Sequence, residues 1–169
     1  TVTGNGNDIG GFIGDNSGDI TNSSATGSVY NTDRYTGGFV GNNRNSTISN
    51  SYSKGNVDTG SNGAPGGLVG WNDGSDVSTS YATGELQGGY GVGGLIGSNS
   101  RDAIVSDSYW DTESTGASSS LANDNGTVSN VNGLTTGEMT GSSASSNMNA
   151  LDLISVRTTN SGDYPTLQE

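Results

Sequence analysis

Few side chains in this sequence are able to do chemistry. The chain has 17 Asp and Glu and five Lys and Arg, but no His and no Cys. The commonest general base and the nitrogen and sulfur ligands of zinc are therefore missing. Two placed carboxylates would suffice to cleave a polysaccharide, and Asp107 and Asp111, beside Tyr109 and Trp110, form the best local pair. Because a chain this acidic offers such pairs by chance, we predict that the protein is not an enzyme.

Oxygen ligands for a hard cation gather in three short segments, at residues 4–8, 72–76 and 122–126. Their Asp and Asn side chains lie on turns, as calcium sites require. None of the three matches an EF-hand loop or the tandem nonapeptide of calcium-binding β-rolls, and Asn and Gly favour turns for backbone reasons alone. We expect no cofactor and keep calcium as the alternative.

Aromatic side chains and sequons suggest surface sites. Trp71, Tyr35 and Tyr90 lie on or near predicted turns, where an amphipathic ring could rest against a sugar. They are the candidate ligand contacts, with packing under a corner as the alternative. Asn45 and Asn125 are the candidate glycosylation sites.

The net charge of −12 limits the partners of the chain. We expect nucleic acid and anionic membranes to repel it, and no apolar stretch is long enough to insert into a membrane. An acidic, lysine-poor surface rich in Asp, Ser, Thr and Asn suits high salt. We therefore expect a halophilic source, with an ordinary acidic extracellular domain as the alternative.

The elements that must position these side chains come from a repeat. A block of two glycines, two apolar residues, Gly, any residue and Asn occurs four times, with spacings of 27, 29 and 27 residues, starting at Gly10, Gly37, Gly66 and Gly93. A strand-like run follows each block. Val2 lies eight residues before Gly10, so residues 1–9 are expected to end a preceding repeat of a longer protein.

The repeat length indicates the fold class. Repeats of this kind form solenoids, propellers or arrays, and a propeller blade needs about 40 residues. Gly, Asn, Ser and Thr fill the unit, and apolar residues lack the helical period. The sequence therefore predicts an all-β protein, a parallel β-solenoid with one repeat of about 27–29 residues per coil.

Alternation along each strand predicts which side chains face inward. The predicted inward columns combine apolar, polar and aromatic residues: Ile20, Asn22, Ser24; Ile48, Asn50, Tyr52; Val77, Thr79, Tyr81; Val105, Asp107, Tyr109. The predicted outward columns form a hydroxyl stripe: Thr21, Ser23; Ser49, Ser51; Ser78, Ser80; Ser106, Ser108. Stacked coils turn such columns into ladders, in which Asn amides can bond from coil to coil. The sequon at Asn22 is discounted because of its predicted inward position.

The segment GGFIGDNSGDITNSSATGSV and its successors resemble the GLUG repeats of bacterial and archaeal surface and secreted proteins. Four such repeats cover residues 10–116, of which the fourth is irregular. The resemblance implies a right-handed parallel β-helix and an adhesin-like role, and it carries no catalytic residues. Residues 117–169 lack the glycine block and are predicted to be a C-terminal cap. In this cap we expect helix around 137–153 and a closing strand and turn over 154–167.

These features favour a non-enzymatic module at the cell surface or in the extracellular space, flanked by other domains of its parent chain. It would act as a stalk and an adhesive face, with weak multivalent binding to a cell-surface glycan or glycoprotein. Three alternatives remain. They are a tail-fibre or spike segment of a virus, an ice- or mineral-binding stripe, and a polysaccharide-cleaving β-helix.

Overall fold

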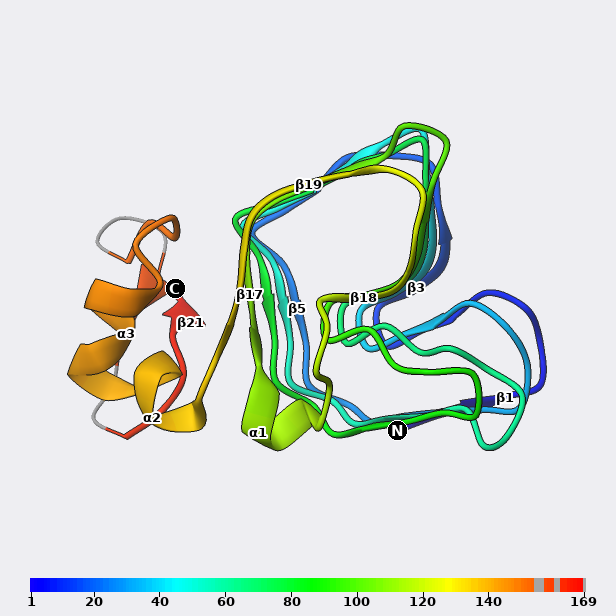
Figure 1. The fold of residues 1–169 in the computed structure, drawn as a ribbon, viewed down its shortest axis with the longest axis horizontal. Coiled ribbons are helices and arrows are strands. Elements are labelled where there is room, and N and C mark those ends of the chain that lie inside the picture. The colour runs from blue at the N-terminus through cyan, green and yellow to red at the C-terminus, as the bar shows by residue number, and fades with distance from the viewer. Residues whose placement is uncertain (154–156, 160–161, 169) are drawn as a thin grey trace.

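Parallel strands wind into a β-solenoid of about four turns, which confirms the predicted fold class. The structure is a computed structural model that describes residues 1–153, 157–159 and 162–168. Figure 1 shows the solenoid end on, with the coils superimposed and the C-terminal helices beside them. None of the described helices is long and apolar enough to cross a membrane.

Three parallel sheets form the walls, and each takes its name here from its first strand. The β1 wall contains β1 (Val2–Gly4), β6 (Val29–Asn31), β11 (Val57–Asp58) and β15 (Leu86–Gln87). The β3 wall contains β3 (Ile13–Asn16), β8 (Val40–Arg44), β12 (Val69–Asp73), β16 (Ile96–Ser100) and β18 (Leu121–Asp124). The β4 wall contains β4 (Ile20–Thr21), β5 (Ser24–Ala25), β9 (Thr47–Ser49), β10 (Tyr52–Ser53), β13 (Asp76–Ser78), β14 (Tyr81–Ala82), β17 (Ile104–Asp111) and β19 (Thr127–Leu134). A small pair joins β2 (Ile9–Gly10) to β7 (Thr36–Gly37).

The paired glycines are needed because successive coils touch backbone to backbone at this point. A Cβ atom on Gly66 would lie 2.6 Å from the backbone nitrogen of Gly97 in the next coil, and one on Gly67 would lie 2.2 Å from the carbonyl oxygen of Gly94. Both distances are far inside van der Waals contact. Any side chain larger than hydrogen would push the coils apart, so the block returns once per coil.

The apolar pair of each block fills the interior. Val40, Val69 and Ile96 are paired in register across three coils, and all are fully buried. Phe12 belongs to the first coil and is 51% exposed, although its ring stacks on that of Phe39 at 5.0 Å. Burial of the apolar residues therefore depends on a neighbouring coil on each side.

Each coil bends once within the β4 wall. The prediction of which side chains face inward is correct before this bend and wrong after it. The opening residues Ile20, Ile48, Val77 and Val105 are buried in the core, as predicted. Two positions later the backbone is left-handed, with φ of 50°, 48°, 45° and 49° at Asn22, Asn50, Thr79 and Asp107. The chain turns at this residue, so the alternation restarts and the later side chains exchange faces. Asn22 is consequently exposed, not inward.

This exchange removes three of the eight residues of the predicted hydroxyl stripe. Ser51, Ser80 and Ser108 are fully buried. Each hydroxyl accepts a hydrogen bond from the backbone of the preceding coil, for example from Ser51 N to Ser80 Oγ at 3.2 Å. The first outward column, which contains Thr21, Ser49, Ser78 and Ser106, remains at least partly exposed, as does Ser23.

The same exchange places three tyrosines outside the solenoid core. Tyr52, Tyr81 and Tyr109, here called the tyrosine row, form a second apolar cluster with residues of the C-terminal segment. The rings of Tyr52 and Tyr81 are stacked at 5.0 Å. Met139 and Met148, both fully buried, cover the row.

The C-terminal segment covers both an end and a side of the solenoid. Its strands β18 and β19 pair with β16 and β17 and so cover the fourth coil. The helices α2 (Thr136–Met139) and α3 (Gly141–Asn147) then lie along the tyrosine row (Figure 1). A short helix, α1 (Thr112–Thr115), follows β17.

The helix predicted around residues 137–153 is thus divided into two short helices. The predicted closing strand and turn corresponds to the antiparallel pair β20 (Arg157–Thr158) and β21 (Thr166–Leu167). Residues 154–156, 160 and 161 of that prediction lie outside the described residues.

Candidate functional site

An open groove of about 630 Å³ runs beside the β3 wall. One side is lined by residues 32–35, Asn62, Ala64 and Tyr90, which belong to the segments that connect the walls. The other side is lined by Gly70, Ser98 and Asn123 of the β3 wall. The groove therefore joins segments from several coils.

Two of the three aromatic residues singled out in the sequence lie at this groove, and the third, Trp71 of β12, contacts one of them. Tyr35 and Tyr90 line it, and Tyr90 is 72% exposed. Trp71 lies behind Tyr35, with ring centroids 4.5 Å apart and planes inclined by 23°. Trp71 thus supports the platform, while the two tyrosines are placed to meet a ligand. Whether they bind one stays a prediction.

The indole of Trp71 is held by two neighbours. Its Nε1 donates a hydrogen bond of 2.6 Å to the hydroxyl of Ser100, one coil further along. The guanidinium of Arg101 lies over the indole at 6.0 Å, within the range of a cation–π contact. These contacts fix the ring and, through it, the ring of Tyr35.

Tyr35 has a left-handed backbone with φ of 52°, which is unusual for a bulky side chain. Its carbonyl accepts a hydrogen bond of 3.2 Å from the N–H of Ile9. Gly70 packs against it so closely that a Cβ atom there would lie 2.4 Å from the carbonyl carbon of Tyr35. Backbone strain of this kind is concentrated at functional sites, so the position of Tyr35 marks the groove as a candidate.

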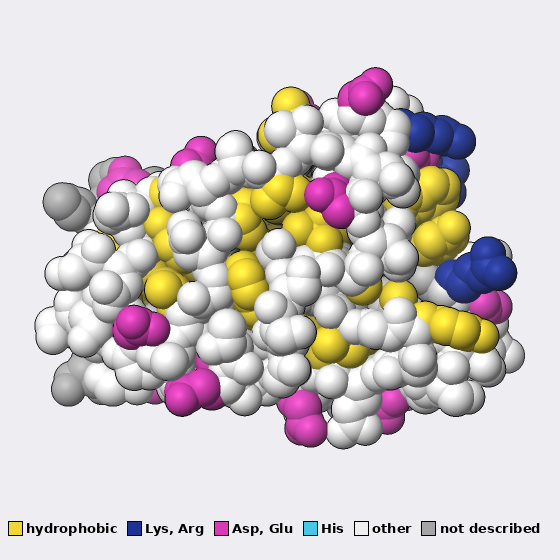
Figure 2. Space-filling view, in the orientation of Figure 1, with side chains coloured by type: hydrophobic (Ala, Val, Ile, Leu, Met, Phe, Trp, Pro, Cys, Tyr) yellow, Lys and Arg dark blue, Asp and Glu magenta, His cyan; other side chains and the backbone are white. Residues whose placement is uncertain are grey.

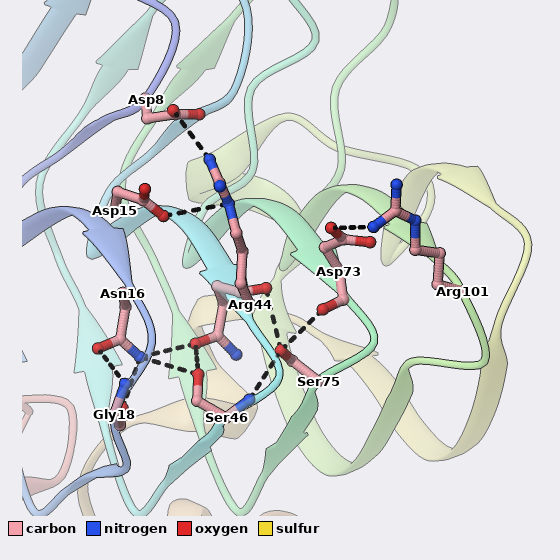
Figure 3. Close-up of polar contacts among 10 residues, drawn as sticks. Asp8, Asp15, Asn16, Gly18, Arg44, Ser46, Asp73, Ser75 and Arg101 are labelled. Atoms are coloured by element: carbon pink, nitrogen blue, oxygen red, sulfur yellow. Dashed lines mark hydrogen bonds and ion pairs between the residues drawn. The ribbon is translucent and has the colours of Figure 1, made fainter.

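The charges on this side of the molecule are mostly paired. Figure 3 shows Arg44 between two carboxylates, with Nε 3.3 Å from Asp15 and Nη2 3.6 Å from Asp8. It also shows Arg101 3.1 Å from the buried carboxylate of Asp73. Burial and the negative charge of Asp15 raise the pKa of Asp8, although Arg44 opposes them.

Sequence reasoning missed Arg34, which lines the groove next to Tyr35. The signal was an isolated cation beside an aromatic residue in a strongly acidic chain. On the face drawn in Figure 2, the Lys and Arg side chains lie along the right-hand edge, next to hydrophobic side chains and with acidic side chains beside them. The groove therefore combines aromatic, cationic and amide groups.

A ladder of buried asparagines runs through the β3 wall behind the groove. Each side chain donates to the next, from Asn16 to Asn43 at 2.8 Å, from Asn43 to Asn72 at 3.1 Å and from Asn72 to Asn99 at 3.0 Å. Asn99 donates in turn to Asp124 at 3.1 Å. Figure 3 shows Asn16, the start of the ladder, with its hydrogen bond to Ser46. The ladder lies at the Asn of the glycine block, not at Asn22 and Asn50 as predicted.

Asp111, one of the two carboxylates proposed from sequence, has a structural role. Asp111 is fully buried and caps α1 by accepting hydrogen bonds from Glu113 N and Ser114 N, both at 2.9 Å. Burial alone would raise its pKa, but hydrogen bonds, first that of Thr136, hold the pKa of Asp111 below its ordinary value. Asp107 instead accepts from the Asn130 amide at 2.7 Å. A general acid needs a proton at working pH, and the lowered pKa of Asp111 disfavours that role.

Two carboxylates of the acidic turns have partners within the protein. Asp73 pairs with Arg101, and Asp124 accepts from Asn99 and from the N–H of Gly126. Across the described ranges, no three His, Cys, Asp or Glu side chains are grouped to hold a metal ion. Calcium binding stays an untested alternative.

Asn45 and Asn125 are exposed. Asn22 is exposed as well, so the reason for discounting its sequon was wrong. All three are open to modification, which remains a prediction.

Comparison with known proteins identifies the repeat. The GLUG motif matches residues 5–30, 32–58 and 61–87. Each matched segment contains one glycine block and its strand-like run, whereas the irregular fourth repeat lies beyond them. No curated protein and no solved structure matches the chain. The chain therefore carries three GLUG motifs, which form successive coils of a β-solenoid.

Proposed function

We propose that this chain is a non-enzymatic binding module of a cell-surface or secreted protein. It serves as a stiff stalk with an adhesive face, flanked by other domains of its parent. One observation carries the proposal. Tyr35 and Tyr90, which lie 55 residues apart in sequence, line one open groove, and the ring of Trp71 stacks on that of Tyr35.

The groove has the chemistry of a sugar-binding surface. Aromatic rings present flat apolar faces on which the C–H face of a sugar can stack. Asn62, Ser98 and Asn123 supply side-chain donors and acceptors for hydroxyl groups along the same groove. A glycan or a glycoprotein is therefore the proposed partner.

The groove is open, so a single contact should be weak. Each domain offers one groove of this composition, and many copies on a cell or many domains in one chain would raise the avidity. The solenoid suits this task because every coil is hydrogen-bonded to the next along the three walls. Such stacking gives a rod that carries the groove away from its anchor.

The acidic surface fits an extracellular setting at high salt. With a net charge of −12 the domain stays soluble and avoids nucleic acid. These properties support the proposed location and the halophilic source.

Binding can be tested with beads that display the domain. We expect the beads to retain host-type cells or polymers that carry glycans, and Tyr90→Ala to reduce retention severalfold. Tyr90 is 72% exposed, so its removal should leave the fold intact. Tyr30→Ala is the matched control, because Tyr30 is also exposed but does not line the groove.

Two results would contradict the proposal. Beads with the domain that bind no better than bare beads would leave only the stalk role. Release of reducing sugar from the same polymers, at a rate above buffer, would support the polysaccharide-cleaving alternative.

A further inference from the structure

We infer that the groove binds a glycan with single, spaced carboxylates, of the uronate type, and that Arg34 contacts the carboxylate. This inference rests on the proposed function and names its ligand class. It depends on how the positive charges of the chain are used.

Most of the cationic side chains already have partners. Arg44 lies between Asp8 and Asp15, and Arg101 is paired with Asp73. Lys54 lies over the rings of Tyr52 and Tyr164, 5.3 and 5.5 Å from their centroids. All three therefore stabilise the protein itself.

Arg34 differs from these residues. It lines the groove and is exposed, and within the described part of the chain its guanidinium forms no ion pair. A guanidinium offers a planar fork of donors that matches a carboxylate with two hydrogen bonds. An acidic sugar needs two contacts, a guanidinium for its carboxylate and an aromatic ring for its apolar face. The ring of Tyr35 would stack on the sugar while Arg34 holds its carboxylate.

The other charge in the groove restricts the ligand further. Asp33 also lines the groove, and its Oδ1 accepts a hydrogen bond of 2.8 Å from the backbone N–H of Arg34. Its carboxylate can accept from sugar hydroxyls but repels a second anionic group nearby. The net charge of −12 repels polyanions at longer range. A glycan with one carboxylate among neutral groups therefore fits better than a densely sulfated chain.

The test compares two polymers that differ only in the acidic group. Polyacrylamide bearing β-glucuronic acid and polyacrylamide bearing β-glucose are passed over the immobilised domain at about 0.15 M salt, and apparent affinities are measured by interferometry. We expect the glucuronic acid polymer to bind at least about fivefold more tightly. Arg34→Gln should remove this preference while leaving binding of the glucose polymer unchanged.

Controls separate the groove from general electrostatics. Arg44→Gln removes the same charge from a paired residue outside the groove, and we expect the preference to persist. Asp33→Asn should raise binding of a heparin polymer more than binding of the glucuronic acid polymer. Circular dichroism should show the same fold for all variants.

The outcomes are distinguishable. Equal binding of the two polymers would overturn this inference and leave the proposed function standing. A preference that survives Arg34→Gln would overturn the role of Arg34. Binding of neither polymer, by a domain that retains no glycan in the bead experiment, would overturn both.

Discussion

Tyr164 donates a hydrogen bond of 2.6 Å from its hydroxyl to Oδ2 of Asp111. The two residues are 53 positions apart, and this contact ties the C-terminal segment to β17. Thr136 donates to the same carboxylate oxygen at 2.6 Å. Burial raises the pKa of Tyr164, and the hydrogen bond to Asp111 raises it further, so the phenol stays protonated as the donor. The residue proposed from sequence as half of a catalytic pair thus holds two parts of the fold together.

This contact predicts how stability depends on pH. The pKa of Asp111 is lowered in the folded protein, and an unfolded Asp titrates at about 3.9. Its stabilising effect is therefore complete above about pH 5 and is lost as the pH falls through the folded pKa. We expect Asp111→Asn to lower the free energy of unfolding by about 1–3 kcal/mol at pH 7. The difference from the wild type should shrink below about pH 4.

Urea unfolding at several pH values measures this difference. Asp107→Asn is the matched control, because Asp107 is partly exposed and its carboxylate accepts one hydrogen bond, from Asn130. A difference for Asp111→Asn that stays constant down to pH 2 would exclude the proposed linkage.

The asparagine ladder predicts a large effect from a small change. Asn72 is fully buried, and its Nδ2 donates to the carbonyl of Ser75 and to Asn99 Oδ1. Asn72→Asp replaces this donor with a charged acceptor between two other acceptors. We expect a loss of about 3–5 kcal/mol in the free energy of unfolding. Asn5→Asp adds the same charge at an exposed position and should change stability by less than about 0.5 kcal/mol.

Chemical denaturation followed by far-UV circular dichroism distinguishes the two variants. Equal stability of Asn72→Asp and Asn5→Asp would mean that the ladder contributes nothing to the free energy of unfolding.

The ladder itself ends at Asp124, whose carboxylate accepts a hydrogen bond from Asn99. An ionised carboxylate has no hydrogen to donate onward.

Charge predicts the response to salt. With a net charge of −12, self-repulsion destabilises the compact state and is screened as the salt concentration rises. We expect the melting temperature to climb steeply between about 0.05 and 1 M KCl, where the Debye length falls to about 3 Å. Differential scanning calorimetry measures this change.

A flat response to KCl would remove the argument for a halophilic source. Millimolar calcium, compared with matched magnesium at the same ionic strength, tests the acidic turns. Extra stabilisation by calcium alone would support a cation site there.

The sequence by itself determined the coil and its period. Gly66 and Gly67 return in every block because the backbones touch at these positions, and the apolar pair that follows must be buried between coils. Both requirements act on neighbouring residues and repeat with each coil. They are therefore visible as spacing in the sequence, without knowledge of the remaining structure.

The tertiary structure decided which side chains of the β4 wall face inward after the left-handed residue of each coil. The left-handed residue is Asn50 in one coil, Thr79 in the next and Asp107 in the one after. An Asn at every one of these positions would have suggested a turn, but the mixture of residue types did not. The change of phase moved Tyr81 from the predicted core of the solenoid to a second buried cluster, which includes Met139 of the C-terminal segment. A change in the sign of one φ angle cannot be read from alternation alone.

The groove also depends on the tertiary structure. Tyr35, Trp71 and Tyr90 were found singly because aromatic residues near turns are conspicuous in the sequence. Trp71 lies in β12, whereas Tyr35 and Tyr90 lie on connecting segments that line the groove beside the β3 wall. Arg34 matters only because it lines the same groove. Stacking fixes which residues repeat, whereas contacts between non-equivalent residues of different coils decide where a ligand can bind.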